Sequence, residues 1–179
     1  MKATLRALDW ESGNLMTPDL EMILVWRNQP RIVKSTYTQR MNHELISPET
    51  HLNWYSTRGP WWRWFVVQAD GKDVGLVSFG QLDSWWPEFG YMLGEAEYEG
   101  KGIMTEALKL AFAWLAKHGY TMVRTVVNND NQISRHIMHK LGFFYLCAGR
   151  PREGVFTKKL NEEWSATEYT SGRKEFMPI

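Results

Sequence analysis

The chain has 179 residues, 44% hydrophobic and 23% charged, a composition typical of one globular domain with a sizeable core. Twenty-one Lys and Arg residues against 20 Asp and Glu leave a formal net charge of +1, which excludes electrostatic attraction to nucleic acid or an anionic membrane as the main function. A single cysteine, Cys147, excludes an intramolecular disulfide, and neither a signal core nor a run of ~18 apolar residues is present. We expect a cytoplasmic protein with no membrane or nucleic-acid partner.

The N-terminal part predicts one strand and two helices. Residues 2–8 alternate loosely between apolar and polar types, as in a strand. A Thr-Pro-Asp triplet at 17–19 supplies a hydroxyl cap, a proline at the first helical position and an acid in the first turn, so a helix begins there; we expect it to end before Pro30. A Ser-Pro-Glu triplet at 47–49 gives the same signal for a second helix. Residues 31–46 are predicted to be a polar connection.

The rest of the chain alternates strands with two longer helices. Helical spacing of apolar residues, followed each time by glycine, predicts helices over 101–118 and 131–141. Runs of β-favouring residues, two of them joined by an Asp-Gly turn, predict strands over 62–67, 73–80, 88–93, 121–128, 143–147 and 155–160. The order β-α-α-β-β-β-α-β-α-β-β indicates a mixed α/β domain over residues 1–160, followed by a polar tail, 161–179, whose order the sequence does not define.

A glycine-rich loop stands between the strand at 88–93 and the next helix, and reads Glu-Gly-Lys-Gly-Ile-Met-Thr-Glu-Ala over residues 99–107. The glycines let the backbone approach a ligand closely, and the unpaired amides and dipole of a helix start attract an anion. The loop lacks the Gly-Lys-Ser/Thr ending of a nucleotide triphosphate loop, and no second unit with a ribose-binding acid follows it. The spacing of the glycines alone leaves an unliganded helix start as the alternative.

The segment at 100–107, together with Asn131-x-x-Ser134-Arg-x-Ile-x-x-Lys-Leu-Gly-Phe143, resembles the GNAT (GCN5-related) superfamily of acetyl-CoA-dependent N-acetyltransferases. The resemblance runs from about residue 3 to residue 160 and is nearest to the ribosomal-protein-acetyltransferase-like branch and to the amino-sugar acetyltransferases of the pseudaminic-acid pathway. It implies a mostly antiparallel central sheet with a V-shaped splay and flanking helices, acetyl-CoA as co-substrate, and no metal. Glu99 departs from the family pattern, which commonly has Arg or Gln there.

The same resemblance assigns the cofactor-binding residues. It implies that the strand residues Tyr91, Met92 and Leu93 pair their free backbone groups with the pantetheine arm, and that Asn131 contacts the pantetheine or the thiol end. It also implies that the loop binds the CoA pyrophosphate, through backbone amides and the charge of Lys101, at residues Gly100, Lys101, Gly102, Ile103, Met104 and Thr105.

Two catalytic roles follow from the resemblance. Ser134 would lie near the CoA sulfur and donate a hydrogen bond to the departing thiolate; the alternative is a small residue chosen for close helix packing. Glu88 would draw a proton from the amine, often through water; the alternative is a solvated acid at a strand entrance. Met138 stands where many members have a tyrosine that protonates the thiolate, and a methionine cannot donate a proton.

The acceptor side is expected at the first two helices. Trp-Arg-Asn at 26–28 and the segment 47–52 resemble the pseudaminic-pathway N-acetyltransferases, which implies acceptor binding by Arg27 and His51. His51 is also a candidate base near pH 7, or a half-exposed helix residue. Tryptophans supply flat surface for a nucleotide base. Strand alternation places Trp62 and Trp64 on the face opposite Phe65, so at least half of the clustered tryptophans are expected in the core or at a homodimer surface.

Three functions remain open. The first is acetyl transfer to a small-molecule primary amine, preferably a nucleotide-linked amino sugar. The second keeps the chemistry and changes the acceptor to a protein N-terminus, a polyamine or an aminoglycoside. The third is a non-catalytic acyl-CoA-binding module. His136 and His139 are predicted to form a solvated face because no third metal ligand accompanies them, and Cys147 is predicted to fill the core rather than act as a nucleophile.

Overall fold

The structure is a computed structural model that describes residues 2–8, 15–36 and 45–160. The predicted tail at 161–179 lies outside the described residues, as do residues 37–44 of the predicted connection. In chain order the elements are β1 (Ala3–Ala7), α1 (Pro18–Arg27), α2 (Pro30–Ser35), α4 (Pro48–Ser56), β2 (Arg63–Ala69), β3 (Lys72–Gly80), β4 (Glu88–Leu93), the short 3-10 helix η1 (Ala96–Tyr98), α5 (Ile103–Lys117), β5 (Met122–Asn128), α6 (Gln132–Lys140), β6 (Phe144–Ala148) and β7 (Glu153–Lys159).

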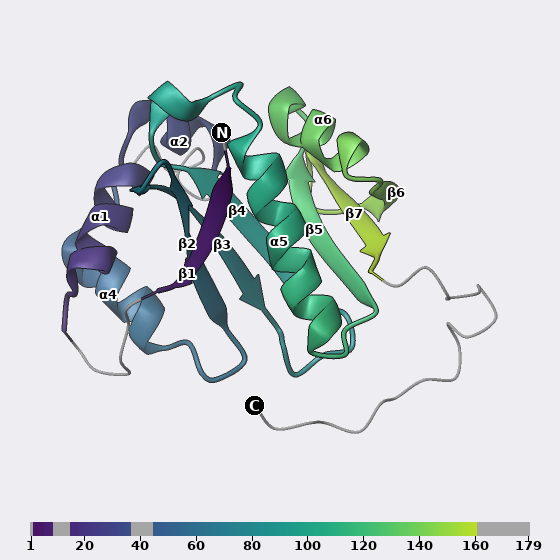
Figure 1. The fold of residues 1–179 in the computed structure, drawn as a ribbon, viewed down its shortest axis with the longest axis horizontal. Coiled ribbons are helices and arrows are strands. Elements are labelled where there is room, and N and C mark those ends of the chain that lie inside the picture. The colour runs from purple at the N-terminus through teal and green to yellow at the C-terminus, as the bar shows by residue number, and fades with distance from the viewer. Residues whose placement is uncertain (1, 9–14, 37–44, 161–179) are drawn as a thin grey trace.

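The strands of the described residues form one seven-stranded sheet in the order β1-β2-β3-β4-β5-β7-β6 (Figure 1). Among these strands every neighbouring pair is antiparallel except β4 and β5, which run parallel and share a single residue pair, Glu88 with Arg124. Asp70 and Gly71 close the β2–β3 hairpin with φ values of 52° and 77°, as a two-residue Asp-Gly turn requires. The predicted mixed, mostly antiparallel α/β fold is confirmed.

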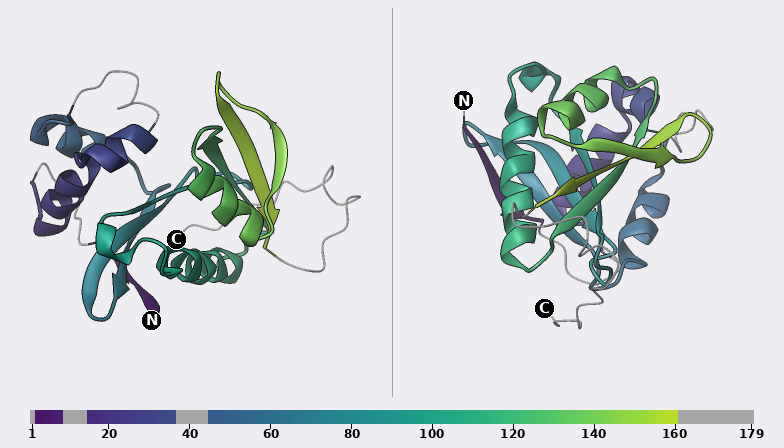
Figure 2. Two further views of the ribbon diagram at one scale, coloured as in Figure 1. Left: turned by 90° about the horizontal axis from the view of Figure 1, so that it is seen from above. Right: turned by 90° about the vertical axis from the view of Figure 1, so that its right-hand side faces the viewer.

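Helices cover both faces of the sheet (Figure 2). The long helix α5 packs across β1, β2 and β3 on one face, and α1, α2 and α4 lie on the other. The core beneath α5 encloses Phe79, Leu108 and Leu115 completely, each worth ~1.5–3 kcal/mol of burial. The second core, beneath α1 and α4, consists of Leu20, Ile23, Trp26, Tyr55, Trp64 and Leu76.

The aromatic residues of β2 separate onto the two faces as predicted. Trp62 and Trp64 stack on each other with their ring centroids 5.9 Å apart, and Trp54 of α4 contacts both. Phe65, which follows Trp64 in the strand, points to the opposite face of the sheet and packs against Trp114 of α5, with the ring centroids 5.2 Å apart. Trp62 and Trp64 therefore pack in the core under α4, whereas Trp61 and Trp85 are exposed.

Two sequence predictions, one at residues 30–35 and one at Cys147, are wrong. Residues 30–35 form α2 rather than a connection, because Pro30 occupies the first helical position, where its missing N–H costs nothing; a proline that ends one helix here opens the next. Cys147 is exposed and not a core residue. It lies on β6, the last strand of the sheet, whose five residues are all exposed.

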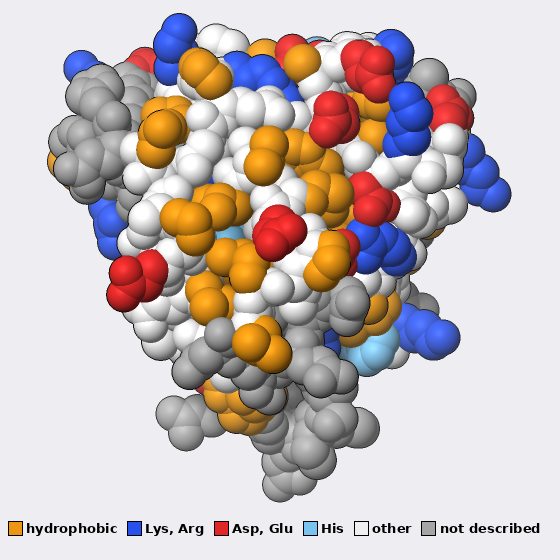
Figure 3. All heavy atoms as spheres, turned by 90° about the vertical axis from the view of Figure 1, so that its left-hand side faces the viewer, with side chains coloured by type: hydrophobic (Ala, Val, Ile, Leu, Met, Phe, Trp, Pro, Cys, Tyr) orange, Lys and Arg blue, Asp and Glu red, His pale blue; other side chains and the backbone are white. Residues whose placement is uncertain are grey.

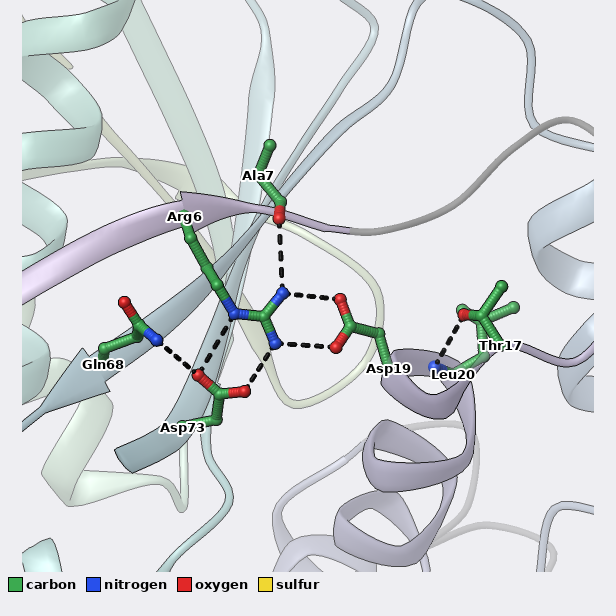
Figure 4. Close-up of polar contacts among 7 residues, drawn as sticks. All are labelled: Arg6, Ala7, Thr17, Asp19, Leu20, Gln68 and Asp73. Carbon is green, nitrogen blue, oxygen red and sulfur yellow. Dashed lines mark hydrogen bonds and ion pairs between the residues drawn. The ribbon is translucent and has the colours of Figure 1, made fainter. Parts of the chain in front are cut away.

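A network of charges around Arg6 ties β1 to α1 and β3 (Figure 4). The guanidinium of Arg6 donates to both carboxylate oxygens of Asp19, at 2.7 Å each, and to both oxygens of Asp73. Gln68 completes the group with a 2.9 Å bond to Asp73. Arg6 is the main cause that lowers the pKa of the Asp73 carboxyl. The cation therefore neutralises two acids that α1 and β3 bring to the same place.

His51 holds α4 against α1 from inside the core. Its ring is fully enclosed, its Nε2 lies 3.0 Å from the Leu20 carbonyl oxygen, and it meets the Tyr55 ring edge-on at 5.0 Å. Nε2 therefore carries the proton and donates. Burial, and then the positive charge of Arg27, lower the pKa of His51 to about 4. The expectation of a half-exposed histidine is wrong, and this imidazole is neutral and a weak base at pH 7.

Replacing Arg6 by Met should lower the free energy of unfolding by about 2–3 kcal/mol at pH 7, because Asp19 and Asp73 lose their cation in a poorly solvated place. Urea unfolding of the wild-type protein and the variant measures this difference in the free energy of unfolding. The pKa of Asp73 is depressed in the folded state, so this stabilisation is present above about pH 4, the usual unfolded-state value, and decreases as pH falls through the folded pKa. Lys72→Met is the control, since its ion pair with Glu97 is exposed and worth ~0–1 kcal/mol. Equal losses of unfolding free energy in Arg6→Met and Lys72→Met would contradict the stabilising role given to the Arg6 network.

The depressed pKa of His51 predicts a second acid-sensitive range. Between pH 6.5 and about 4 the unfolded chain binds a proton that the folded chain does not, so folding stability should fall by about 1.4 kcal/mol per pH unit. His51→Gln should be less stable at pH 7 but should lack this slope. The exposed residue His136 provides the matched variant, His136→Gln, which should keep the slope. An unchanged slope in His51→Gln would show that another group titrates.

Candidate active site

The glycine-rich loop lies open at the start of α5. Gly100 and Gly102 have φ values of 71° and 76°, and a Cβ built on either would contact nothing within 4 Å. Gly102 caps α5 without a side-chain hydrogen bond, and the first bond of the helix runs from the Glu106 amide to the Gly102 carbonyl oxygen at 3.1 Å. The amides of the first turn therefore lack helical partners. The residues of this turn, Ile103, Met104 and Thr105, are buried, and the open space beside them lies at Gly100 and Gly102.

Lys101 and Glu99 flank this loop. Lys101 is exposed, and its ammonium lies 5.1 Å from the centre of the Tyr98 ring, which leaves its charge available to an anion. Glu99, the residue that departs from the family pattern, forms a 2.9 Å ion pair with Arg31. The acid at this position is thus balanced by a cation from α2.

The sheet opens beside the loop, between β4 and β5. The last contacts joining the two strands are a 3.0 Å bond from the Arg124 amide to the Pro87 carbonyl oxygen and a 2.9 Å bond from the Thr125 hydroxyl to the Phe89 carbonyl oxygen. Backbone groups of alternate strand residues face the same side, so the amide and carbonyl of Tyr91 come next in this series. No strand of the described residues pairs with them there. The predicted splay is present and begins after Phe89.

Two side chains from the helical face hold the end of β4. Arg31 donates to the Leu93 carbonyl oxygen at 2.9 Å and to that of Gly94. The indole of Trp26 covers Gly94 so closely that a Cβ there would lie 2.0 Å from the ring, and its Nε1 donates to Glu95 at 2.7 Å. The sequence did not predict this role of Arg31, which lies in the segment 31–46 predicted to be a connection. The one signal in the sequence is the unusual acid Glu99, which Arg31 neutralises.

The start of α6 closes the far side of the opening. Asn131 caps the helix, with its side-chain oxygen accepting from the Ser134 amide at 3.0 Å, so part of this side chain is already used inside the protein. Ser134 is partly buried in the first turn. The apolar residues of α6 differ in burial: Ile133 is 74% exposed, while Met138 is completely enclosed. Met138 belongs to the core beneath α5 rather than to the opening.

Glu88 lies where β4 and β5 meet. Its carboxylate is 3.4 Å from Nε of Arg124, and its side chain is 39% exposed. Arg124 also donates to Gln81 at 2.8 Å and lies 4.9 Å from the Trp86 ring centre. Glu88 therefore reaches solvent at the point where the split begins, but as a proton acceptor it would share its charge with Arg124.

The two predicted acceptor residues are neighbours on α1 and α4 with different access. The guanidinium of Arg27 lies 5.5 Å from the centre of the Trp54 ring and is partly exposed, and burial lowers its pKa. His51 exposes no surface, so it can influence an acceptor through the charge and position of Arg27 but does not offer a contact itself.

The remaining candidates do not form a further centre. His136 and His139 are exposed, as predicted. Within the described ranges, no group of three or more His, Cys, Asp or Glu side chains is arranged to hold a metal ion. Of the helices in those same ranges, none combines the length and apolarity needed to cross a bilayer.

Comparison with solved structures supports the fold. A domain from Methanocaldococcus jannaschii DSM 2661 superposes with a TM-score of 0.77 at 26% identity, covering 88% of this chain and 98% of that domain. A spermidine N-acetyltransferase from Vibrio cholerae, in complex with CoA and spermine, superposes with a TM-score of 0.68 at 20% identity, covering 89% and 96%. At that identity the second match concerns the fold alone.

Comparison with curated sequences finds partial relatives, and comparison with family models identifies the family. An uncharacterized protein of M. jannaschii is 30% identical over 145 residues, 79% of this chain and 29% of that protein. The spermidine N(1)-acetyltransferase of Escherichia coli K12 is 35% identical over 88 residues, 45% of each chain. The matches thus span less than half the length of these relatives. The acetyltransferase (GNAT) domain family matches residues 14–144, and the chain belongs to this family.

Proposed function

We propose that this chain is an acetyl-CoA-dependent N-acetyltransferase that binds its co-substrate across the split between β4 and β5. The observation that carries the proposal is the meeting of two unsatisfied backbone surfaces at one place. The first-turn amides of α5 lack helical partners, and the Tyr91 backbone lacks a strand partner on the β5 side within the described residues. A ligand with an anionic diphosphate and an amide-bearing arm satisfies both.

The residues present fit such a ligand. The open surface at Gly100 and Gly102 admits the diphosphate close to the backbone, and the amides of residues 103–105 with the Lys101 ammonium supply donors and positive charge. The pantetheine amides would add to β4 as a short strand against Tyr91, with Leu93 already held by Arg31. Asn131 keeps its side-chain amide N–H groups for the same arm while its oxygen caps α6.

The chemistry proposed is direct transfer from the thioester to a bound amine. Acetyl-CoA supplies an acetyl group that is already activated. Glu88, at the start of the split and accessible to solvent, would take the amine proton directly or through water, and Ser134 would donate to the developing thiolate. Holding two substrates in line accounts for up to ~7–11 kcal/mol of the barrier in ideal cases. The exposed Cys147 on β6 is not required as a nucleophile.

For the acceptor we propose a small molecule that carries a primary amine and an anionic group, such as a nucleotide-linked amino sugar. Arg27 and Arg58 both place their guanidinium groups over the Trp54 ring, at 5.5 and 4.5 Å, and Arg58 lies 4.8 Å from the Trp62 ring centre. This combination suits a phosphate and a flat base. On the face in Figure 3, acidic and basic side chains are interspersed among apolar ones rather than gathered as a polycation would require.

A polyamine acceptor is the second candidate. The observation in its favour is the similarity to spermidine acetyltransferases, which covers less than half of the curated sequence. A cytoplasmic location suits either acceptor.

Binding of acetyl-CoA is tested at Gly102. Gly102→Ala should raise the dissociation constant for CoA at least tenfold, about 1.4 kcal/mol, because the new Cβ occupies space next to the amides. Gly119→Ala is the matched control: Gly119 also has positive φ, 86°, with nothing within 4 Å of a Cβ, but it follows the other end of α5. Both variants pay the same backbone strain, ~1–2 kcal/mol. Isothermal titration calorimetry on the two variants checks this; equal CoA affinities would overturn the site.

Acceptor choice is tested by acetyl-CoA consumption with nucleotide-linked amino sugars, spermidine, an aminoglycoside and a peptide. We expect turnover on a nucleotide-linked amino sugar, and in Arg27→Gln a KM for it about tenfold higher with the KM for acetyl-CoA unchanged. Lys34→Gln, an exposed cation on α2, should change neither constant. Turnover on spermidine alone would reverse the order of the candidates, and CoA binding without turnover on any amine would indicate the non-catalytic module.

A further inference from the structure

The phenol of Tyr91 crosses the opening between β4 and α6. Its ring stacks on that of Phe89, two residues earlier on β4, with centroids 6.1 Å apart. Phe89 in turn packs against Phe112 and Phe143, so both rings lie on the α5 face of the sheet. Phe89 is the last residue of β4 bonded to β5. Tyr91 therefore projects its side chain at the place where the strands have just separated.

The hydroxyl of Tyr91 has an unusual environment. It is buried, yet among the described residues no hydrogen bond of good geometry satisfies it. The polar side chain that acts on it is Ser134, from the first turn of α6. Buried hydroxyl groups without a partner are rare in folded proteins, and each calls for a reason such as a ligand or a catalytic role. An acceptor atom placed between Tyr91 and Ser134 would receive a hydrogen bond from each of them.

The electrostatics make Tyr91 a permanent donor. Burial raises the pKa of its phenol to about 12, while the contact with Ser134 acts in the opposite direction. The phenol thus keeps its proton at neutral and moderately alkaline pH. Met138, one turn further along α6 from Ser134, carries no proton to give and is enclosed in the core.

We propose that the Tyr91 hydroxyl, with Ser134 beside it, donates a hydrogen bond to the sulfur of CoA as the thioester is cleaved. The amine nitrogen forms the bond to the acetyl carbon, the carbon–sulfur bond breaks, and its electron pair stays on sulfur. The amine proton leaves to Glu88 or water. Tyr91 keeps its own proton, because a phenol of this acidity is a weaker acid than a thiol, ~8.5, and the thiolate takes a proton from solvent on release. The inference rests on the proposed function.

The test measures the acidity of the CoA thiol bound to the enzyme, which needs no acceptor. Cys147→Ala serves as the parent protein because it leaves the CoA thiol as the only thiol in the sample. Ultraviolet difference absorbance of the thiolate is recorded against pH with saturating CoA, and CoA affinity is measured by calorimetry. We expect Tyr91→Phe to raise the pKa of the bound thiol by about 1 unit, a tenfold loss of thiolate stabilisation, with CoA affinity near neutral pH unchanged.

Two further variants separate a donor from a structural role. Tyr145→Phe, at an exposed tyrosine of β6, should leave the thiol pKa where the parent has it. Replacement of Tyr91 by 3-fluorotyrosine keeps the size of the side chain and makes the phenol a stronger donor, so the thiol pKa should move down; loss of packing cannot produce opposite shifts. The fluorotyrosine variant also tests whether Tyr91 donates to the sulfur if Tyr91→Phe fails to fold.

The outcomes distinguish this inference from the proposed function. If the parent binds CoA and neither change at Tyr91 moves the thiol pKa, the role of Tyr91 is wrong while the CoA site stands. If the parent does not bind CoA, both are wrong. Opposite shifts for phenylalanine and fluorotyrosine establish the donor.

Discussion

The separation of β4 from β5 after one residue pair is the constraint on which the rest of this structure depends. Strand backbones must find hydrogen-bond partners, and elsewhere in the sheet each described strand finds them in antiparallel ladders. Because β4 and β5 are parallel, the chain has to cross between them through α5, which puts the start of that helix at the carboxyl end of β4. The open strand edge and the unpaired helix amides are thus two consequences of one topology.

The opening persists because packing on both faces fixes its edges. On the α1 side, the Trp26 ring packs on Gly94, and Arg31 donates to the carbonyl oxygens of the two residues that end β4 and follow it. These oxygens are therefore not available for pairing with β5. On the α5 side, the rings of Phe89 and Tyr91 stack on each other with centroids 6.1 Å apart, which fixes this part of β4 against the core. Thr125 fixes the starting point of the split by its bond to Phe89.

Local signals in the sequence predicted most elements, and their failures share a cause. β4 has the predicted bounds, and α5 and α6 begin within two residues of expectation, because glycines, caps and apolar spacing act locally. Pro30 carries both a stop and a start signal, and only the packing of α2 decides between them. Cys147 is exposed because β6 is the edge strand of the described sheet, and the burial of His51 depends on α1. The loop was predictable for the same local reason, whereas Arg31 and the Tyr91 hydroxyl reach the site through contacts distant in sequence.

Binding and chemistry are divided between backbone and side chains in this arrangement. The proposed co-substrate surface consists of backbone amides and of glycines without side chains, while Ile103 and Met104 are buried in the core. That leaves few groups for the proposed reaction, and they come from two elements that meet at the split: Glu88 and Tyr91 from β4, and Ser134 from α6. The proposed acceptor face, which includes Arg27 of α1, Trp54 of α4 and Arg58 after α4, lies across the sheet from α5. The two surfaces are linked through the end of β4, where Trp26 of α1 donates to Glu95 and Arg31 of α2 contacts Leu93 and Glu99, so changes at Arg27 and Trp54 are better placed to alter the amine alone than changes at Trp26 or Arg31.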